Sequence, residues 1–207
     1  VYAMTDFTFD LGAFPIDVNT GVRYVATSQT SFGYQKIDGV WSDAPVKFDA
    51  DYNDLLPSLN INMSLTDDLQ LRFAAARVMS RASLSQLSGK RDISTNDRTI
   101  KSGNPELDPL RANQFDLALE WYFEQGSLLA FTAFYKDLES FITSAKTGTD
   151  TYEGDIFEVY SYINGEGSKI KGAELVVQFP FSALNKNLEG FGVNANYTWV
   201  DSSDGNI

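Results

Sequence analysis

The sequence predicts an all-β protein, an antiparallel up-and-down meander of about eight strands, and two observations support this prediction. The first is a strict alternation of apolar and polar residues. A two-residue period places apolar groups on one face of a strand and polar groups on the other. It is clearest where Leu59, Ile61, Met63 and Leu65 alternate with Asn60, Asn62 and Ser64. The second observation is that short and long connectors follow one another along the chain.

Segments with the two-residue period recur along the whole chain. Phe115, Leu117 and Leu119 share one face of a segment that continues to residue 124, and 190–201 repeats the pattern. Val, Ile, Thr and aromatic residues, which favour strands, are abundant in these segments. The expected strands span 1–13, 21–35, 46–65, 69–80, 112–124, 127–145, 156–180 and 190–201.

The connectors between these strands alternate in length. The stretches 66–68 and 124–126 are tight turns, and the linkers 14–20 and 181–189 are compact. The polar stretches 36–45, 81–111 and 146–158 follow the other strand ends. In a meander, all short connectors therefore fall on one side of the sheet and all long ones on the other. Outer-membrane barrels show this asymmetry, with short periplasmic turns and long extracellular loops.

Aromatic residues lie where a membrane barrel needs them. Trp121, Tyr122 and Phe123 precede a tight turn, and Tyr197 and Trp199 lie toward the loop end of the last strand. Trp and Tyr concentrate at membrane–water boundaries because one part of the ring is apolar and another polar. An aromatic cluster inside a soluble β-sandwich is the competing interpretation, and the connector asymmetry favours the membrane.

Composition excludes several classes of function. The 207 residues carry a net charge of −12, and an acidic chain repels phosphate backbones, so no nucleic-acid partner is expected. The sequence has no histidine, the commonest general base, and no cysteine for a thiolate metal site. No apolar run is long enough for a transmembrane helix, although barrel strands need only about ten alternating residues.

No catalytic residue, metal site or cofactor site is predicted. Asp116 and Glu120 lie on one side of a strand at a separation of about 13 Å, which is too far for paired-carboxylate chemistry. They are expected to be solvated charges facing the lumen. Asp150, Glu153 and Asp155 could hold calcium, but their spacing does not match a calcium-binding loop. The protein is therefore not expected to be an enzyme.

Loop aromatics are the candidate ligand-binding residues. Sugar rings stack on aromatic faces, while polar side chains fix the hydroxyl groups. Packing within the loops is the alternative role for each of these rings. The candidates are Trp41, Tyr152, Tyr160 and Tyr162.

The chain resembles the β-barrel region of TonB-dependent outer-membrane receptors, in particular those of Caulobacter- and Xanthomonas-like bacteria. The matching words cover nearly all of it in order: GVRYVATSQTSFGY, LLPSLNINMSLTDDLQLRFAAARVMSRASLSQL, SGNPELDPLRANQFDLALEWYF, FTAFYKDLESFI, NGEGSKIKGAELVVQ and NYTWVDSS. Ala82 after Arg81 departs from the proline that the family favours, which affects only the entry to that loop.

The resemblance implies a barrel of twenty-two strands in the outer membrane of a Gram-negative bacterium, with its lumen filled by a plug. Residues 1–207 would then be a partial barrel without plug or TonB box, and contact with the TonB complex would lie outside the chain. The implied function is uptake of a scarce nutrient, carbohydrate or chelated iron such as a siderophore complex, with membrane lipid as a further partner. A soluble carbohydrate-binding β-sandwich and a complete eight-stranded barrel remain as alternatives.

Overall fold

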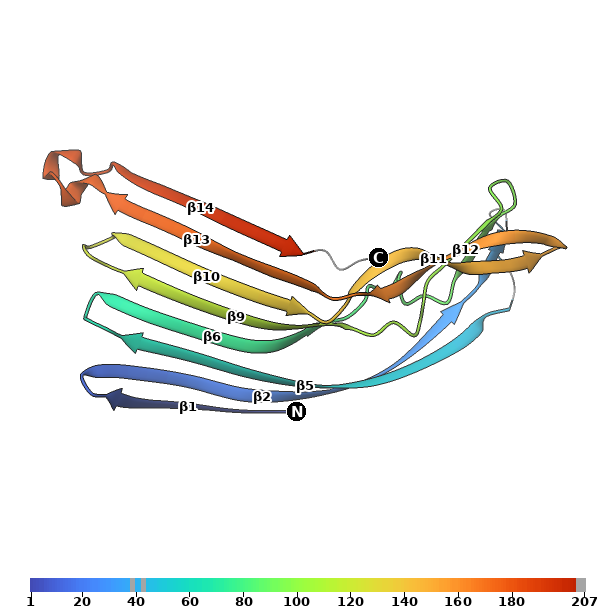
Figure 1. The fold of residues 1–207 in the computed structure, drawn as a ribbon, viewed down its shortest axis with the longest axis horizontal. Helices are drawn as coiled ribbons and strands as arrows, with labels where there is room; N and C mark the ends of the chain where they lie inside the picture. Colours follow the sequence, from blue (N-terminus) through green and yellow to red (C-terminus); the bar gives the residue numbers. More distant parts are fainter. Residues whose placement is uncertain (38–39, 42–43, 204–207) are drawn as a thin grey trace.

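The computed structural model describes residues 1–37, 40–41 and 44–203. Its main element is an eight-stranded sheet (Figure 1) in which every pair of neighbouring strands is antiparallel. Six of the eight expected segments each contribute one strand to this sheet, and the other two contribute part of their length. In spatial order the strands are β1 (Tyr2–Leu11), β2 (Phe14–Gly33), β5 (Val46–Ser64), β6 (Leu69–Ser80), β9 (Leu110–Trp121), β10 (Leu128–Leu138), β13 (Ser168–Pro180) and β14 (Gly192–Ser203).

The strand register collects the apolar side chains on one face of the main sheet, called here the outward face. One row across it contains Phe7, Val18, Ile61, Phe73, Leu117, Ala133, Ala173 and Trp199. These side chains are not sealed in an interior, since Leu117 and Trp199 are 48% and 50% exposed. An exposed apolar face contradicts the β-sandwich, in which such groups interdigitate with a second sheet. The closed eight-stranded barrel is also excluded for the described residues, because β1 and β14 are not paired.

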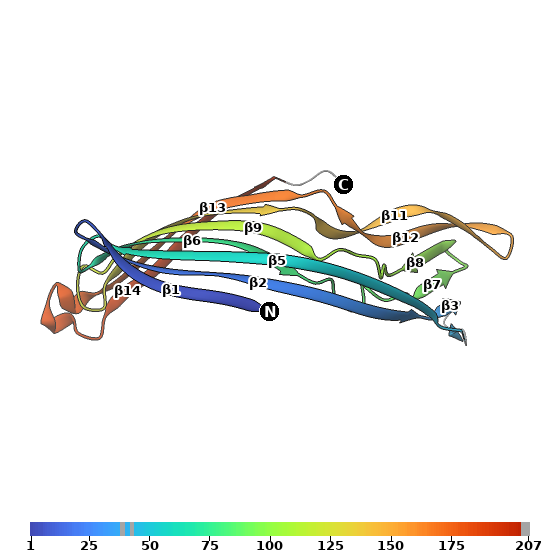
Figure 2. The same ribbon diagram turned by 90° about the horizontal axis from the view of Figure 1, so that it is seen from below.

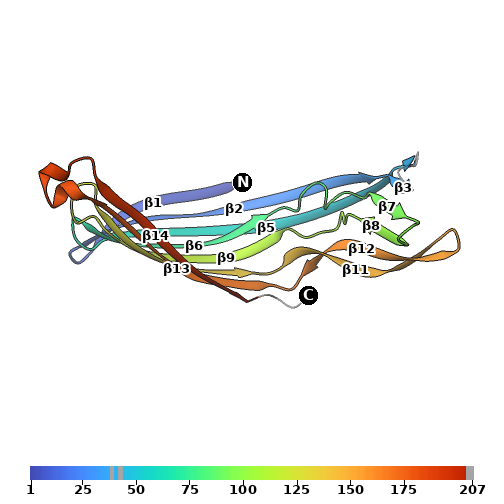
Figure 3. The ribbon, with the colours of Figure 1, turned by 90° about the horizontal axis from the view of Figure 1, so that it is seen from above.

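The opposite, inward face is polar and concave. Its neighbouring row contains Thr8, Asp17, Asn62, Arg72, Ala118, Thr132, Glu174 and Thr198. The sheet arches along its length (Figures 2 and 3). A hollow of 460 Å³ is lined by residues that include Asp17, Asn62, Arg72 and Asp116, which shows that the polar face lies inside the curve.

The outward apolar band is as tall as a membrane requires. On β2 the alternate positions from Phe14 to Tyr24 are apolar except for Thr20. This run is about 33 Å long at about 3.3 Å per residue. With a strand tilt of about 40°, within the range of membrane barrels, the band spans about 25 Å. The described residues contain no helix long and apolar enough to cross a membrane.

Short connectors gather at one end of the main sheet, as the sequence predicts (Figure 1). They are 12–13, 65–68, 122–127 and 181–191, the last containing the 3₁₀ turns η1 (Phe181–Ala183) and η2 (Lys186–Leu188). Gly12 and Gly126 adopt φ of +67° and +78°, which glycine reaches without strain. The expected linker at 14–20 was wrong, because β2 already begins at Phe14 and the turn is only two residues long.

The long connectors form a second, six-stranded sheet at the other end, called here the cap sheet. The expected strands 127–145 and 156–180 each break in two, because β11 and β12 leave the main sheet. The β12–β8 and β3–β7 pairs are parallel, which a meander does not predict. In spatial order the cap sheet contains β11 (Phe141–Tyr152), β12 (Asp155–Gly165), β8 (Thr99–Ser102), β7 (Arg91–Ser94), β3 (Gln35–Ile37) and β4 (Val40–Trp41).

The cap sheet is curled around a small apolar core. Ile93, Ile100 and Phe157 are 1–5% exposed and form this core. Arg91 of β7 forms an ion pair of 2.5 Å with Asp150 of β11, although β8 and β12 lie between them. Three strand spacings in a flat sheet would separate these residues by about 14 Å. The ion pair therefore closes the sheet across its core.

Candidate functional site

The segment 81–109 between β6 and β9 folds against the inward face of β2. The Arg81 guanidinium donates to Thr27 Oγ1 at 3.1 Å, and the Gly89 N–H donates to Ser31 Oγ at 3.1 Å. The Gln29 amide donates to the Pro105 carbonyl at 3.1 Å. Thr27, Gln29 and Ser31 alternate with outward positions such as Tyr24 and therefore point inward. The segment, called here the inner loop, thus lies on the lumen side of the wall where Arg81, Gly89 and Pro105 contact β2, and its strands β7 and β8 belong to the cap sheet.

Close backbone contacts fix the inner loop in place. A Cβ at Gly33 would lie 1.8 Å from the Gly89 carbonyl oxygen, and a Cβ at Gly103 would lie 2.1 Å from that of Ser88. Real atoms cannot approach so closely, so only glycine permits this packing of backbone against backbone. The inner loop is therefore held by shape as well as by hydrogen bonds.

The sequence Asn104–Pro109 ties the inner loop to the cap sheet. The Asn104 side chain donates to the Tyr162 carbonyl at 3.0 Å. The Asn164 side-chain amide donates to the Asp108 carbonyl and accepts from the Asp108 N–H, both at 3.0 Å. Leu107 and Pro109 are buried beside these contacts. These contacts hold 104–109 against β12.

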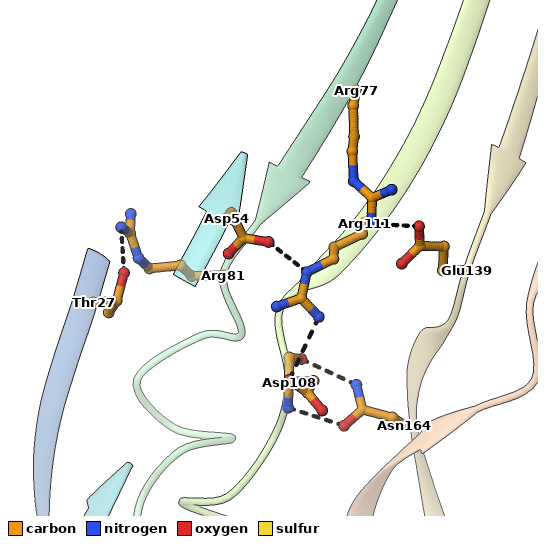
Figure 4. A network of polar contacts seen from close by, with 8 residues as sticks. All are labelled: Thr27, Asp54, Arg77, Arg81, Asp108, Arg111, Glu139 and Asn164. Atoms are coloured by element: carbon orange, nitrogen blue, oxygen red, sulfur yellow. Dashed lines mark hydrogen bonds and ion pairs between the residues drawn. The ribbon is translucent and has the colours of Figure 1, made fainter. Parts of the chain in front are cut away.

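A buried ion pair anchors the start of β9 (Figure 4). The Arg111 Nε donates to Asp54 Oδ1 at 2.5 Å, and its Nη1 lies 3.4 Å from Asp108 Oδ1. The Asp54 side chain is only 3% exposed. Arg77 pairs with Glu139 at 2.6 Å beside them. Sequence reasoning missed this cluster, because its members come from five strands or connectors that only the tertiary structure brings together.

The structure places the four candidate aromatics in the cap sheet. Tyr152 packs on the apolar core, edge to face against Phe157 with ring centroids 5.7 Å apart. Tyr160 and Tyr162 lie on the opposite face of β12 from Phe157, and both are half-buried. Trp41 lies in β4, and its side chain falls outside the described part of the structure. Tyr160 and Tyr162 are therefore adjacent on one face, whereas Tyr152 belongs to the core.

A charged cluster surrounds Tyr160. Lys146 Nζ donates to Glu158 Oε1 at 2.6 Å, and the Tyr160 hydroxyl donates to Glu158 Oε2 at 2.9 Å. These bonds hold the pKa of Glu158 below its ordinary value, with the larger effect from Lys146. The bond to Glu158 in turn raises the pKa of Tyr160. Tyr160 thus keeps its proton and its ring is held in a fixed orientation by its hydroxyl.

Carboxylates outnumber cations on the inward face of the main sheet. Asp116 and Glu120 both lie on this face, where Glu120 pairs with Arg72 at 3.0 Å. The described residues contain no group of acidic side chains that could hold a metal ion. Asp150 and Asp155 pair with Arg91 and Arg98. The charged residues of the inward face are Asp6, Asp10, Asp17, Asp54, Asp116, Glu120 and Glu174 against Arg23, Arg72 and Lys136.

Solved structures share this fold. A variant of the ferric enterobactin receptor PfeA from Pseudomonas aeruginosa, in complex with enterobactin, superposes with a TM-score of 0.62 at 15% identity over 96% of this chain and 35% of that one. The siderophore receptor PirA from Acinetobacter baumannii superposes with a TM-score of 0.55 at 13% identity, and the match covers 99% of this chain and 36% of that one. A double mutant of the Serratia marcescens hemophore receptor HasR, in complex with its hemophore HasA and heme, superposes with a TM-score of 0.55 at 14% identity. The match covers 86% of this chain and 31% of that one.

This chain therefore spans about a third of the length of each of these receptors. No curated protein matches the chain. The family described as "TonB dependent receptor-like, beta-barrel", whose members are transporters and not enzymes, matches residues 1–207. The chain belongs to this family as part of its β-barrel, in the outer membrane of a Gram-negative bacterium.

Proposed function

We propose that this chain forms the wall and mouth of a receptor that imports a scarce nutrient with energy relayed by the TonB complex. The observation that carries the proposal is the inner loop, which is fixed against the lumen side of β2 at the extracellular end of the wall. A rigid loop inside the mouth can present side chains to a ligand above the plug. Binding sites are commonly built from loops positioned on such a scaffold.

Carbohydrate is the substrate class that the charges and aromatics support best. The inward face carries an excess of carboxylates, which disfavours anionic complexes such as ferric catecholates. Tyr160 and Tyr162 offer two neighbouring rings, and Glu158 and Lys146 lie beside them as hydrogen-bonding groups. Stacking on aromatic rings with polar groups at the rim is how sugars are held. Membership of the Caulobacter- and Xanthomonas-type subgroup, suggested by the sequence words, stays a prediction.

Chelated iron is the second candidate. The receptors with the same fold include those for ferric enterobactin and for a heme-carrying hemophore. Similarity at 13–15% identity supports the fold and leaves the ligand open.

Uptake by the full-length receptor tests both candidates. Cells expressing it would receive radiolabelled maltodextrins or chitin oligosaccharides, and separately ⁵⁵Fe bound to a catecholate siderophore, with and without TonB. We expect TonB-dependent uptake of a sugar, reduced at least tenfold by Tyr160→Ala. Tyr197→Ala, which removes a lipid-facing ring that is 69% exposed, is the matched control. Uptake of the iron complex alone would overturn the sugar assignment, and TonB-independent uptake would overturn the energy coupling.

A further inference from the structure

A pocket interrupts the outward face where β5 and β6 separate. Their pairing ends at Ser58–Ala76, whereas β6 stays paired with β9 as far as Ser80–Leu110. Beyond the Ser58–Ala76 pair, the wall therefore has an opening with β5 on one side and β6 and β9 on the other. A pocket of 570 Å³ lies in the opening, lined among others by Asp54, Leu55, Pro57, Arg77, Arg111 and Glu139.

The pocket lies at the upper border of the apolar band. Leu55 pairs with Tyr24 and Pro57 with Val22, all on the outward face, and Leu55 is 59% exposed. Arg77 also points outward, because it follows Ala75 by two residues on β6. Apolar contacts therefore end and ion pairs begin at this level. In an outer membrane, the polar headgroups of outer-leaflet lipids occupy this depth.

A further ion pair on the same face marks the same border. Lys171 and Asp201 lie 3.2 Å apart on β13 and β14, just beyond the outward apolar residues of those strands. The change from apolar to charged side chains thus crosses the sheet, and the pocket is the hollow part of that border.

A buried acceptor without a partner borders the pocket from its inward side, because Asp54 pairs with the inward residue Val25. Asp54 Oδ1 accepts from Arg111, but Asp54 Oδ2 has no hydrogen-bond partner, although the side chain is 3% exposed. A buried polar atom in this state costs free energy until a donor reaches it. Arg77 and Glu139 add donors and acceptors at the rim, where both are partly exposed.

The charges of the pocket favour a neutral polyol. The guanidinium groups of Arg77 and Arg111 are offset by Asp54, Glu139 and the nearby Asp108. A bare phosphate would find no excess positive charge in this set. A sugar ring, which carries several hydroxyl groups that both donate and accept, matches the mixture of groups.

We propose that this pocket binds the saccharide headgroup of an outer-leaflet glycolipid. The sugar hydroxyls contact Arg77 and Glu139 at the rim, in front of the buried Asp54–Arg111 pair. The acyl chains lie along the outward face past Leu55 and Val22. The bound lipid fills the opening between β5 and β9, and this role is independent of the nutrient carried through the lumen.

Native mass spectrometry of the full-length receptor in detergent tests the proposal. The probes are purified lipopolysaccharide, phosphatidylglycerol, and inorganic phosphate. Asn53→Trp fills the pocket without removing an ion pair, because Asn53 is exposed and lines it. We expect at least a tenfold loss of bound lipopolysaccharide in this variant. Ser28→Trp adds the same bulk to the outward face of the neighbouring strand, farther from the membrane, and is expected to bind normally.

Other outcomes are equally decisive. Arg77→Gln is expected to weaken lipopolysaccharide binding severalfold while leaving the barrel folded, because Arg77 is partly exposed. Heat-modifiable mobility in gels verifies the fold of each variant. Equal binding to wild type and Asn53→Trp would overturn the proposal, and so would competition by phosphate alone or equal binding of phosphatidylglycerol. Nutrient uptake measured on the same variants separates this lipid site from the transport proposal.

Discussion

Two hydrogen bonds join the side chain of Asn164 to the backbone of Asp108. The Asn164 amide nitrogen donates to the Asp108 carbonyl and its oxygen accepts from the Asp108 N–H, both at 3.0 Å. Asn164 belongs to β12 of the cap sheet, and Asp108 precedes β9 of the wall. Since Asp108 also lies beside Arg111, the same few residues connect the cap sheet, the inner loop and the buried ion pair.

Replacing Asn164 should loosen the inner loop without unfolding the barrel. Asn164→Ala removes both bonds, which costs about 1–3 kcal/mol of local stability. We expect faster amide hydrogen exchange across 103–109 in the full-length receptor, with unchanged exchange in β9. Asn164→Asp keeps the acceptor but places a carboxylate oxygen against the Asp108 carbonyl, so it should be at least as disruptive. Protection of 103–109 equal to wild type in both variants would show that other contacts hold the loop.

Gly33→Ala should displace the inner loop by steric conflict. The new Cβ would lie 1.8 Å from the Gly89 carbonyl oxygen, so backbone must move. Ser31→Ala removes only the hydrogen bond to the Gly89 N–H and serves as the milder comparison, at a cost of about 1 kcal/mol. Limited proteolysis of the full-length receptor should cleave within 81–90 much faster in Gly33→Ala than in Ser31→Ala. Equal cleavage rates would contradict the tight packing of Gly33 on Gly89.

The main sheet could be predicted from the sequence because the alternating pattern that produces it lies within each strand. Alternation along a strand fixes which residues share a face, and the predicted strand 69–80 coincides with β6. The four short strands of the cap sheet, β3, β4, β7 and β8, could not be predicted, because they carry no long alternating pattern. The four residues of β7 form a local hairpin with β8, but their second partner, β3, is more than 50 residues away in the sequence.

The candidate site could be predicted only in part. Aromatic content led to Tyr160 and Tyr162, which the structure places side by side on β12, but it also led to Tyr152, which packs on the cap-sheet core. Nothing in the sequence distinguishes a core ring from a surface ring at these positions. Asp54 and Arg111 are 57 residues apart, and no local pattern links them.

Breaking the buried ion pair should destabilise the wall strongly. Asp54→Asn leaves Arg111 facing a neutral amide, and loss of one partner of a buried pair costs about 3–5 kcal/mol. Replacing both residues, as Asp54→Leu with Arg111→Met, should cost less than the single change because no buried charge is left alone. Urea unfolding of the full-length receptor in detergent, followed by tryptophan fluorescence, gives the comparison. A double variant less stable than Asp54→Asn would contradict this account.

Low pH should open the cap sheet before it affects the wall. The hydrogen bond from Arg91 holds the pKa of Asp150 below its ordinary value, with further help from the Thr151 N–H. A depressed folded-state pKa stabilises the fold above the unfolded value of 3.8, and the effect disappears as pH falls through the folded-state value. Protection factors in β11 and β7, which correct for the acid dependence of intrinsic amide exchange, should therefore fall below pH 4, whereas β9 and β10 keep their protection. In Arg91→Gln this contribution is already absent, so exchange should be faster at neutral pH and change less with acid. A wild-type cap sheet whose protection is constant from pH 7 to pH 3 would exclude the Arg91–Asp150 pair as its closing contact.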